Sequence, residues 1–310
     1  MRLGANQSLR RLCALSNLCH YSSTMTSILA PSRLTRWNSS RFAPLAAIAL
    51  TAFFGVCPLE AGAADLRIAA ASDLTFAFND VAARFEKQTG HRVELAYGSS
   101  GNFFAQIENG APFDLFFSAD VGYPQKLEAA GLTVPGTIYE YASGKLVMWV
   151  PNASRLDLSR GLAALLDPAV GKIAIANPQH APYGVAAVAA MRREGVYDKI
   201  KDKLVLGENI SQTAQFVQSG NAEVGLVALS LAVAPAMKDK GRYVEIPARD
   251  YPPIIQAAVI LKSSRNKKLA NQLLKFMKEP ETVEVMERYG FAVPKDVAGT
   301  RSPDATPASR

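Results

Sequence analysis

Cysteine is scarce in this 310-residue sequence, and every cysteine lies within the first 57 residues. The three cysteines are Cys13, Cys19 and Cys57, so the long remainder of the chain has neither a disulfide nor a thiol nucleophile. Histidine is almost as rare, since only His91 and His180 lie beyond Cys57. With no cysteine and no histidine pair at metal-ligand spacing there, we expect no transition-metal cation site.

Net charge is also low over most of the chain. The formal charge is +7, which at first favours a nucleic-acid or membrane-surface partner. Residues 1–63 hold six arginines and one acid, Glu60, so the remaining 28 basic and 26 acidic residues give a net charge of only +2. Such a nearly neutral chain lacks a basic footprint, and we expect no nucleic-acid partner.

No apolar run is long enough to span a membrane. The apolar stretch at 43–56 is shorter than the roughly 20 residues of a spanning helix. Three arginines precede it and the small residues 61–63 follow it, which is the pattern of an export signal. We therefore expect residues 1–63 to be a signal peptide with an N-terminal extension, cleaved near Ala63, with no membrane insertion afterwards. The alternatives are a retained anchor, a lipid anchor at Cys57 and a start at Met25.

Beyond the leader, short apolar runs alternate with amphipathic segments. The runs predict buried strands over 66–71, 93–97, 114–118, 146–150, 172–176, 224–228 and 254–261. Apolar residues at helical spacing predict helices over 75–89, 101–109, 123–130, 183–193, 211–219, 265–278 and 280–289. A further segment, 159–166, follows the strand at 146–150. This alternation predicts an α/β fold, with mostly parallel sheets flanked by helices.

The predicted strands fall into two sets, and the last long run is well placed to return to the first set. We therefore expect two lobes joined by two crossings. The expected bounds are 64–145 and 256–294 for lobe I, 146–255 for lobe II, and 144–148 and 252–257 for the crossings. Residues 295–310 lack apolar periodicity and are expected to be disordered.

Polar residues stand at four points where a predicted helix begins. These junctions are 69–74, 97–102, 177–184 and 208–211. A helix start presents unpaired N–H groups and a partial positive charge, so it holds a small anion without a counter-ion. Serine hydroxyls such as those of Ser72 and Ser100 add further donors. Each junction alone is explained by ordinary helix capping, but four together favour an anion site.

Signals for catalysis are weaker. A serine hydrolase of the Gly-x-Ser-x-Gly type needs a spacing that 98–101, Gly-Ser-Ser-Gly, does not have. No dinucleotide or Walker A glycine pattern follows a strand, so no nucleotide cofactor is expected. We expect a binding protein rather than an enzyme, and a secreted hydrolase that uses Ser100 remains an alternative.

The motifs at these junctions resemble those of the periplasmic molybdate-binding proteins of ABC transporters, the ModA family. The resemblance covers about 65–294, and its most specific motif is Gly-Ala-Pro-Phe-Asp-Leu-Phe at 110–116. Further matching motifs lie at 69–72, 118–120, 177–180 and 288–291. The resemblance implies a two-lobed periplasmic-binding-protein fold of type II, a periplasmic location and a monomer. It also implies molybdate or tungstate as ligand, no cofactor, and a permease and an ATPase as partners.

By motif position, the resemblance implies five contacts to the oxyanion. Ser72 and Ser100 match serine ligands, Tyr183 and Ile210 match positions that give backbone N–H groups, and Asp73 is a further backbone candidate. All of these are contacts to the oxygens of molybdate and none is a ligand of its metal. A sulfate- or phosphate-binding protein of the same fold is the nearest alternative, and a sensor or scaffold subunit without a transporter is another.

The sequence departs from the family at two positions. Some members place a tyrosine hydroxyl on the oxyanion where this sequence has Ala228, so a substitute donor is needed, either the Tyr183 side chain or the group at position 73. The carboxylate of Asp73 would repel a dianion if it pointed inward. We therefore expect it to point away, or to act only through its N–H as a helix cap.

Overall fold

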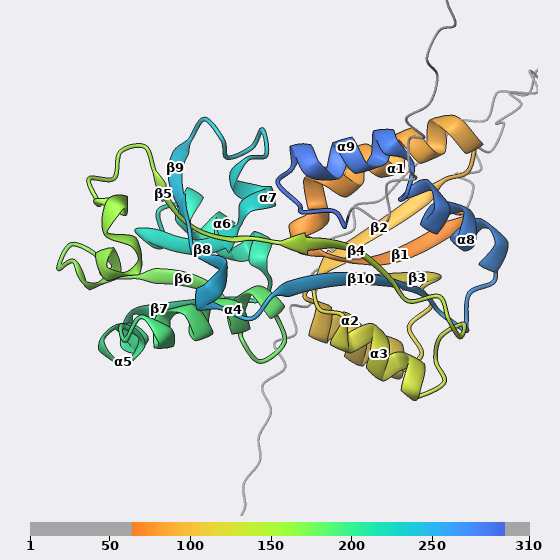
Figure 1. Ribbon diagram of the computed structural model, residues 1–310, viewed down its shortest axis with the longest axis horizontal. Coiled ribbons are helices and arrows are strands. Elements are labelled where there is room, and N and C mark those ends of the chain that lie inside the picture. Colours follow the sequence, from red (N-terminus) through yellow and green to blue (C-terminus); the bar gives the residue numbers. More distant parts are fainter. Residues whose placement is uncertain (1–63, 295–310) are drawn as a thin grey trace, which may run out of the picture. The chain divides into compact units, whose positions relative to one another are not determined.

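The computed structural model describes residues 64–294, which form ten strands in two five-stranded sheets (Figure 1). The strand orders are β2-β1-β3-β10-β4 in the first sheet and β7-β6-β8-β5-β9 in the second. The predicted leader, 1–63, and the predicted tail, 295–310, lie outside the described residues. Within 64–294, no helix has both the length and the apolar character needed to cross a membrane.

The first sheet is covered by helices on both faces. Its strands are β1 (Leu66–Ala71), β2 (Val93–Gly98), β3 (Leu115–Ser118), β4 (Tyr139–Gly144) and β10 (Ile254–Ile260). Its helices are α1 (Thr75–Thr89), α8 (Lys267–Phe276) and α9 (Pro280–Arg288) on one face, and α2 (Ser100–Glu108) and α3 (Gly122–Ala129) on the other. Because successive strand residues point to opposite faces, Ile68 packs with α1 and Ala69 with α2 in separate apolar clusters.

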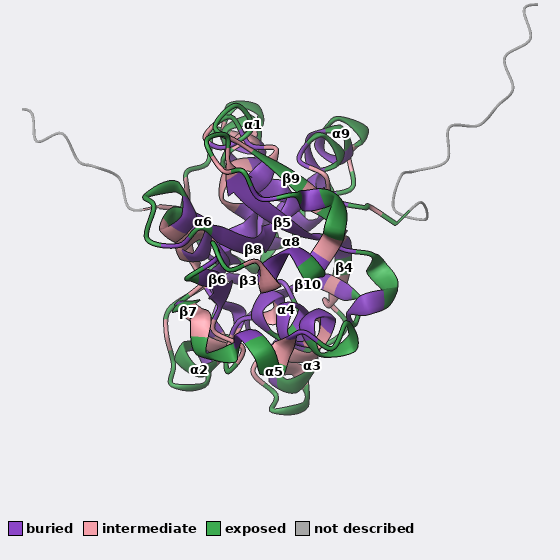
Figure 2. Ribbon diagram, turned by 90° about the vertical axis from the view of Figure 1, so that its left-hand side faces the viewer, coloured by how far each residue is buried: buried purple, intermediate pink, exposed green. Residues whose placement is uncertain are grey.

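The second sheet repeats this plan. Its strands are β5 (Leu146–Pro151), β6 (Ile173–Ala176), β7 (Leu204–Gly207), β8 (Val224–Ala228) and β9 (Gly241–Glu245). Its helices are α4 (Pro182–Arg193), α5 (Tyr197–Ile200), α6 (Ile210–Gln218) and α7 (Leu229–Ala232). In Figure 2 buried residues fill the strands at the centre, whereas α1, α2 and α5 expose an outer face.

The predicted α/β class is confirmed, and the structure refines the pairing within each sheet. In the first sheet β1 pairs in parallel with β2 and β3, and β10 pairs in antiparallel with β3 and β4. In the second sheet β6 pairs in parallel with β7 and β8, and β5 pairs in antiparallel with β8 and β9. Strands β4, β7 and β9 were not predicted, because they are short or mix polar with apolar residues. The segment at 159–166 is a 3₁₀ helix, Leu158–Leu166, interrupted at Gly161, where φ is 56°.

The chain passes between the two sheets twice. It leaves the first sheet after β4 and enters the second at β5, with only Lys145 between the two strands. It returns through the segment between β9 and β10. In both sheets the parallel strands lead into helices, so η1 (Ser72–Leu74), α2, α4 and α6 begin after the carboxyl ends of strands. Ligands of such sheets bind beyond these strand ends.

Candidate functional site

The four predicted junctions meet around one small cavity. Its lining comes from both sheets and consists of Ala71, Ser72, Asp73, Gly98, Ser99, Ser100, Ala119, Ala181, Pro182, Tyr183 and Ile210. All five residues predicted to contact the anion are in this set. The free volume of the cavity is about 10 Å³, which leaves room for about one water molecule. The lining contains no lysine or arginine, so positive potential must come from backbone N–H groups.

Three helices direct their first turn toward this cavity. Helix α2 begins at Ser100, α4 at Pro182 and α6 at Ile210. Proline suits the first helical position because its missing N–H would be unpaired there anyway. The first N–H groups of each helix have no intrahelical acceptor, and they carry the positive end of the helix dipole.

Helix capping explains fewer of the junction residues than expected. Only Asn209 acts as a side-chain cap, accepting a hydrogen bond from the N–H of Gln212 at 3.0 Å. Ser72, Asp73 and Ser100 make no capping hydrogen bond in the helices they open. The Asp73 side chain therefore does not cap a helix, and its carboxyl has other partners.

Ser100 is fully buried where α2 follows β2. Its Oγ accepts a hydrogen bond from the N–H of Ala119 at 2.9 Å. The next residue, Gly101, donates its N–H to the carbonyl of His180 at 2.9 Å. A Cβ at Gly101 would lie 2.7 Å from that carbonyl oxygen, so only glycine permits this approach between α2 and the loop before α4.

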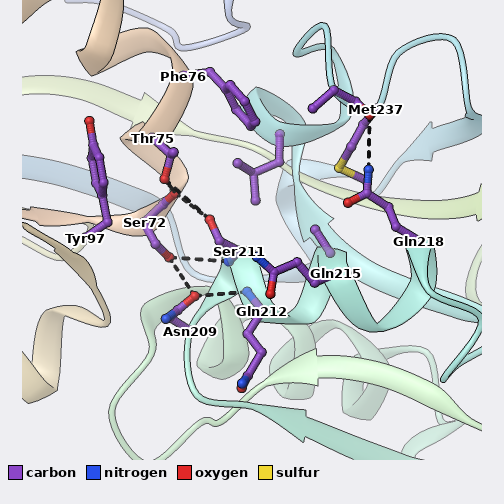
Figure 3. Close-up of a pocket in the computed structure, with 13 residues that line it drawn as sticks. Ser72, Thr75, Phe76, Tyr97, Asn209, Ser211, Gln212, Gln215, Gln218 and Met237 are labelled. Carbon is purple, nitrogen blue, oxygen red and sulfur yellow. Dashed lines mark hydrogen bonds between the residues drawn. The ribbon is translucent and has the colours of Figure 1, made fainter.

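Ser72 connects the first sheet to helix α6 (Figure 3). Its Oγ donates to Asn209 Oδ1 at 3.2 Å and accepts from the N–H of Ser211 at 3.3 Å. The Ser211 hydroxyl donates in turn to the carbonyl of Ser72 at 2.8 Å. These groups also border a larger cavity of about 400 Å³ between α1 and α6, whose lining is neutral throughout.

Asp73 is the one acidic residue that lines the small cavity. Its side chain does not turn toward solvent, since the residue is only 1% exposed. Oδ2 accepts hydrogen bonds from the Tyr183 hydroxyl at 3.0 Å and from Gln256 Nε2 at 2.5 Å. Burial raises the pKa of Asp73 to about 6, although the hydrogen bonds from Gln256 and Tyr183 act in the opposite direction.

The Tyr183 side chain is occupied by this contact with Asp73. Burial, followed by the nearby charge of Asp73, raises the pKa of Tyr183 well above its ordinary value. The hydroxyl therefore stays protonated and acts as a donor to the carboxyl. At the position of the missing tyrosine, Ala228 is fully buried, and nearby Ser230 donates its hydroxyl to the carbonyl of Asp73 at 2.7 Å.

Gln256 is the site residue that we did not single out from the sequence. It lies in the otherwise apolar strand β10, and its Oε1 accepts a hydrogen bond from the Tyr141 hydroxyl at 2.7 Å. A fully buried amide in an apolar strand must find partners. The signal for Gln256 in the sequence was that it is the one polar residue in an apolar run. The run itself was correctly predicted to be a strand.

The geometry gives the hydrolase alternative no support. His180 Nδ1 lies 2.9 Å from the hydroxyl of Ser99 rather than that of Ser100. Among residues 64–294, no histidine forms a hydrogen bond with the Ser100 hydroxyl, whose oxygen accepts one from the Ala119 N–H. In the same part of the chain, no three acidic, histidine or cysteine side chains are grouped so as to hold a metal ion.

Comparison with known proteins places the chain in a family. The family model described as bacterial extracellular solute-binding protein matches residues 66–292. The molybdate-binding protein ModA of Azotobacter vinelandii is 41% identical over 239 residues, which cover 77% of this chain and 94% of that protein. ModA of Rhodobacter capsulatus is 40% identical over 245 residues, covering 79% and 94%.

A solved structure agrees with these sequence matches. The periplasmic molybdate-binding protein of Azotobacter vinelandii superposes with a TM-score of 0.71 and 38% identity, covering 74% of this chain and all of that one. The match thus extends over both sheets, with the site between them. The chain belongs to the bacterial extracellular solute-binding proteins and, among these, to the ModA family.

Proposed function

We propose that this protein binds molybdate, and also tungstate, outside the cytoplasm and delivers the anion to an ABC importer. The observation that carries the proposal is the meeting of several helix starts and two serines around one cavity that has no basic side chain. Such a site suits a small oxyanion. The relatives named for molybdate binding, at 40–41% identity, support molybdate over other oxyanions.

The proposed contacts come from both sheets. Ser72 and Ser100 give hydroxyl donors from the first sheet, together with the N–H of Asp73. Tyr183 and Ile210 give N–H groups from the second sheet. To bind, the Ser72 hydroxyl turns from Asn209 toward the anion and the Ser100 hydroxyl donates its proton, which its present contact with Ala119 leaves available.

Selectivity follows from the number and the spacing of these donors. Donors held by rigid helix starts cannot follow the smaller ring of oxygens in sulfate. A site with few acceptors also disfavours an anion that carries a proton, such as hydrogen phosphate. The site thereby separates molybdate from both competitors by geometry and by hydrogen-bond type.

Transport requires that the two sheets move as lobes about the crossings at Lys145 and between β9 and β10. The anion favours the closed arrangement only through contacts that it makes better there. Contacts that already connect the two halves, such as Tyr183 with Asp73, assist this closure. A permease and its ATPase then recognise the closed, monomeric protein in the periplasm, after the leader has been removed near Ala63.

The protein acts by binding and release rather than by catalysis, as its solute-binding relatives do. Calorimetric titration of the purified protein with molybdate, tungstate, sulfate and phosphate tests the proposal. We expect one molybdate or tungstate per chain and much weaker binding of the other two anions. Tighter binding of sulfate or phosphate would replace the molybdate assignment with one of those anions.

A further inference from the structure

The two oxygens of the Asp73 carboxyl have different environments. Oδ2 accepts two hydrogen bonds, from Tyr183 and Gln256. Oδ1 is buried and has no hydrogen-bond partner. The N–H groups of Asp73 and Leu74 lie near enough to lower the carboxyl pKa, but neither meets hydrogen-bond geometry with Oδ1. A buried polar atom without a partner is costly and calls for an explanation.

Within residues 64–294, no positive group offsets a charge on this carboxyl. The side chains that face it are Tyr183 from α4 and Gln256 from β10, with Tyr141 of β4 behind Gln256. Ser230 of α7 contacts the Asp73 carbonyl. The titratable neighbours are therefore tyrosines alone, and no ion pair of Asp73 exists among the described residues.

We propose that Asp73 determines specificity by entering the complex as the neutral acid, with its proton on Oδ1 donated to an oxygen of the anion. This inference rests on the proposed function. Oδ2 already accepts two donors, so Oδ1 is the oxygen that carries the proton. The acid thereby supplies the hydrogen-bond donor that some family members take from the tyrosine at the position of Ala228.

Charge conservation gives the proposal a measurable consequence. An ionised Asp73 beside a dianion would place like charges together in a buried site. Binding therefore takes up one proton from solvent for each anion bound, whenever the carboxyl of the free protein is ionised. The raised pKa of about 6 places that ionisation just below neutral pH, and the bound dianion raises the pKa further.

The protonation state also separates classes of anion. The acid form offers a donor and suits a fully deprotonated anion such as molybdate. The ionised form offers an acceptor and suits an anion that carries its own proton, such as hydrogen phosphate. Asp73 held as the acid therefore selects for molybdate.

The test is calorimetric titration of the purified protein with molybdate between pH 6 and pH 8, in buffers of different ionisation enthalpy. For the unchanged protein we expect uptake of about one proton per anion at pH 8, and an affinity that falls by up to about tenfold per pH unit above pH about 6. Asp73→Asn keeps the shape and a donor but cannot titrate. We expect no proton uptake for this variant, and less than about a twofold change in affinity over the same range.

A matched control separates Asp73 from the imidazole of His180, which lies 2.9 Å from the Ser99 hydroxyl at the cavity. His180→Gln is expected to keep the proton uptake of the unchanged protein. Molybdate binding without proton uptake at pH 8 would overturn the role of Asp73 and leave the proposed function standing, and this readout needs no variant. Loss of the uptake in His180→Gln would also overturn it. Failure of the unchanged protein to bind molybdate at any pH would overturn the proposed function itself.

Discussion

The hydroxyl of Tyr183, on helix α4 beside the second sheet, donates a hydrogen bond to Oδ2 of Asp73, which follows strand β1 of the first sheet. The two residues are 110 positions apart in the chain, and both are buried. The amide of Gln256, in the strand that returns to the first sheet, completes the contact. A direct polar connection between the two halves therefore lies at the wall of the small cavity.

Removing the Tyr183 hydroxyl tests this connection. Tyr183→Phe leaves Asp73 Oδ2 with Gln256 alone, and we expect the free energy of unfolding to fall by about 1–3 kcal/mol, the usual cost of a lost buried hydrogen bond. Urea unfolding measures the change. In the control Tyr197→Phe, the deleted hydroxyl has no hydrogen-bond partner among the described residues, and we expect a change below about 0.5 kcal/mol. Equal effects of the two substitutions would rule out the connection as a source of stability.

Gly144, the last residue of β4, tests the same contact from the other side. A Cβ at this position would overlap the Tyr183 hydroxyl and lie 2.8 Å from Gln256 Nε2. We expect Gly144→Ala to lower the free energy of unfolding by about 1–3 kcal/mol, as other insertions into packed sites do, and to weaken molybdate binding. Gly171→Ala is the control, since its nearest new neighbour would be the Glu223 carboxyl at 3.7 Å. A Gly144→Ala protein as stable as this control would show that the site has more room than the structure gives it.

Ser100 tests the anion contacts themselves. A hydrogen bond to a charged group contributes about 1.5–3 kcal/mol, so we expect Ser100→Ala to weaken molybdate binding by about tenfold to a hundredfold. Calorimetric titration measures the affinity, and the exposed Ser159→Ala serves as the control. Unchanged affinity in Ser100→Ala would remove this residue from the site.

The buried carboxyl of Asp73 makes the stability depend on pH. Its pKa is about 6 in the folded protein and has the ordinary value of 3.8 when the chain is unfolded. Because the folded state holds the proton more tightly, the contribution of Asp73 is complete below pH 3.8 and is lost as the pH rises to about 6. The difference between the folded and unfolded pKa of Asp73 corresponds to about 3 kcal/mol.

Comparison of Asp73→Asn with the unchanged protein isolates this effect from all other carboxyl groups. We expect the variant to gain about 2 kcal/mol of relative stability between pH 4 and pH 6.5, and little more above that. Urea unfolding across this range gives the difference at each pH. A difference that stays constant with pH would show that Asp73 has the same pKa in both states.

The sequence predicts the parts of the site that depend on local pattern. The strand ends and helix starts around Ser72, Ser100, Tyr183 and Ile210 were predicted from apolar runs and polar junctions, and all four residues line one cavity. The topology of parallel strands explains this success, because it brings such junctions to the same edge of a sheet. Whether these residues contact the anion stays a prediction.

What the sequence did not predict depends on contacts between distant segments. The hydrogen bond that the carboxyl of Asp73 accepts from Gln256, 183 positions along the chain, was not predicted. No local pattern encodes a partner at that separation. Strands β4 and β9 were missed for a related reason, because they are stabilised by pairing with β10 and β5 rather than by an apolar run of their own.

The measurement that tests the central claim most directly is a titration of the purified protein with molybdate in the presence of a large excess of sulfate and phosphate. We predict one molybdate bound per chain, with an affinity that the two competing anions leave nearly unchanged. Loss of the molybdate signal under this competition, or its absence without any competitor, would contradict the assignment of this cavity as a molybdate site.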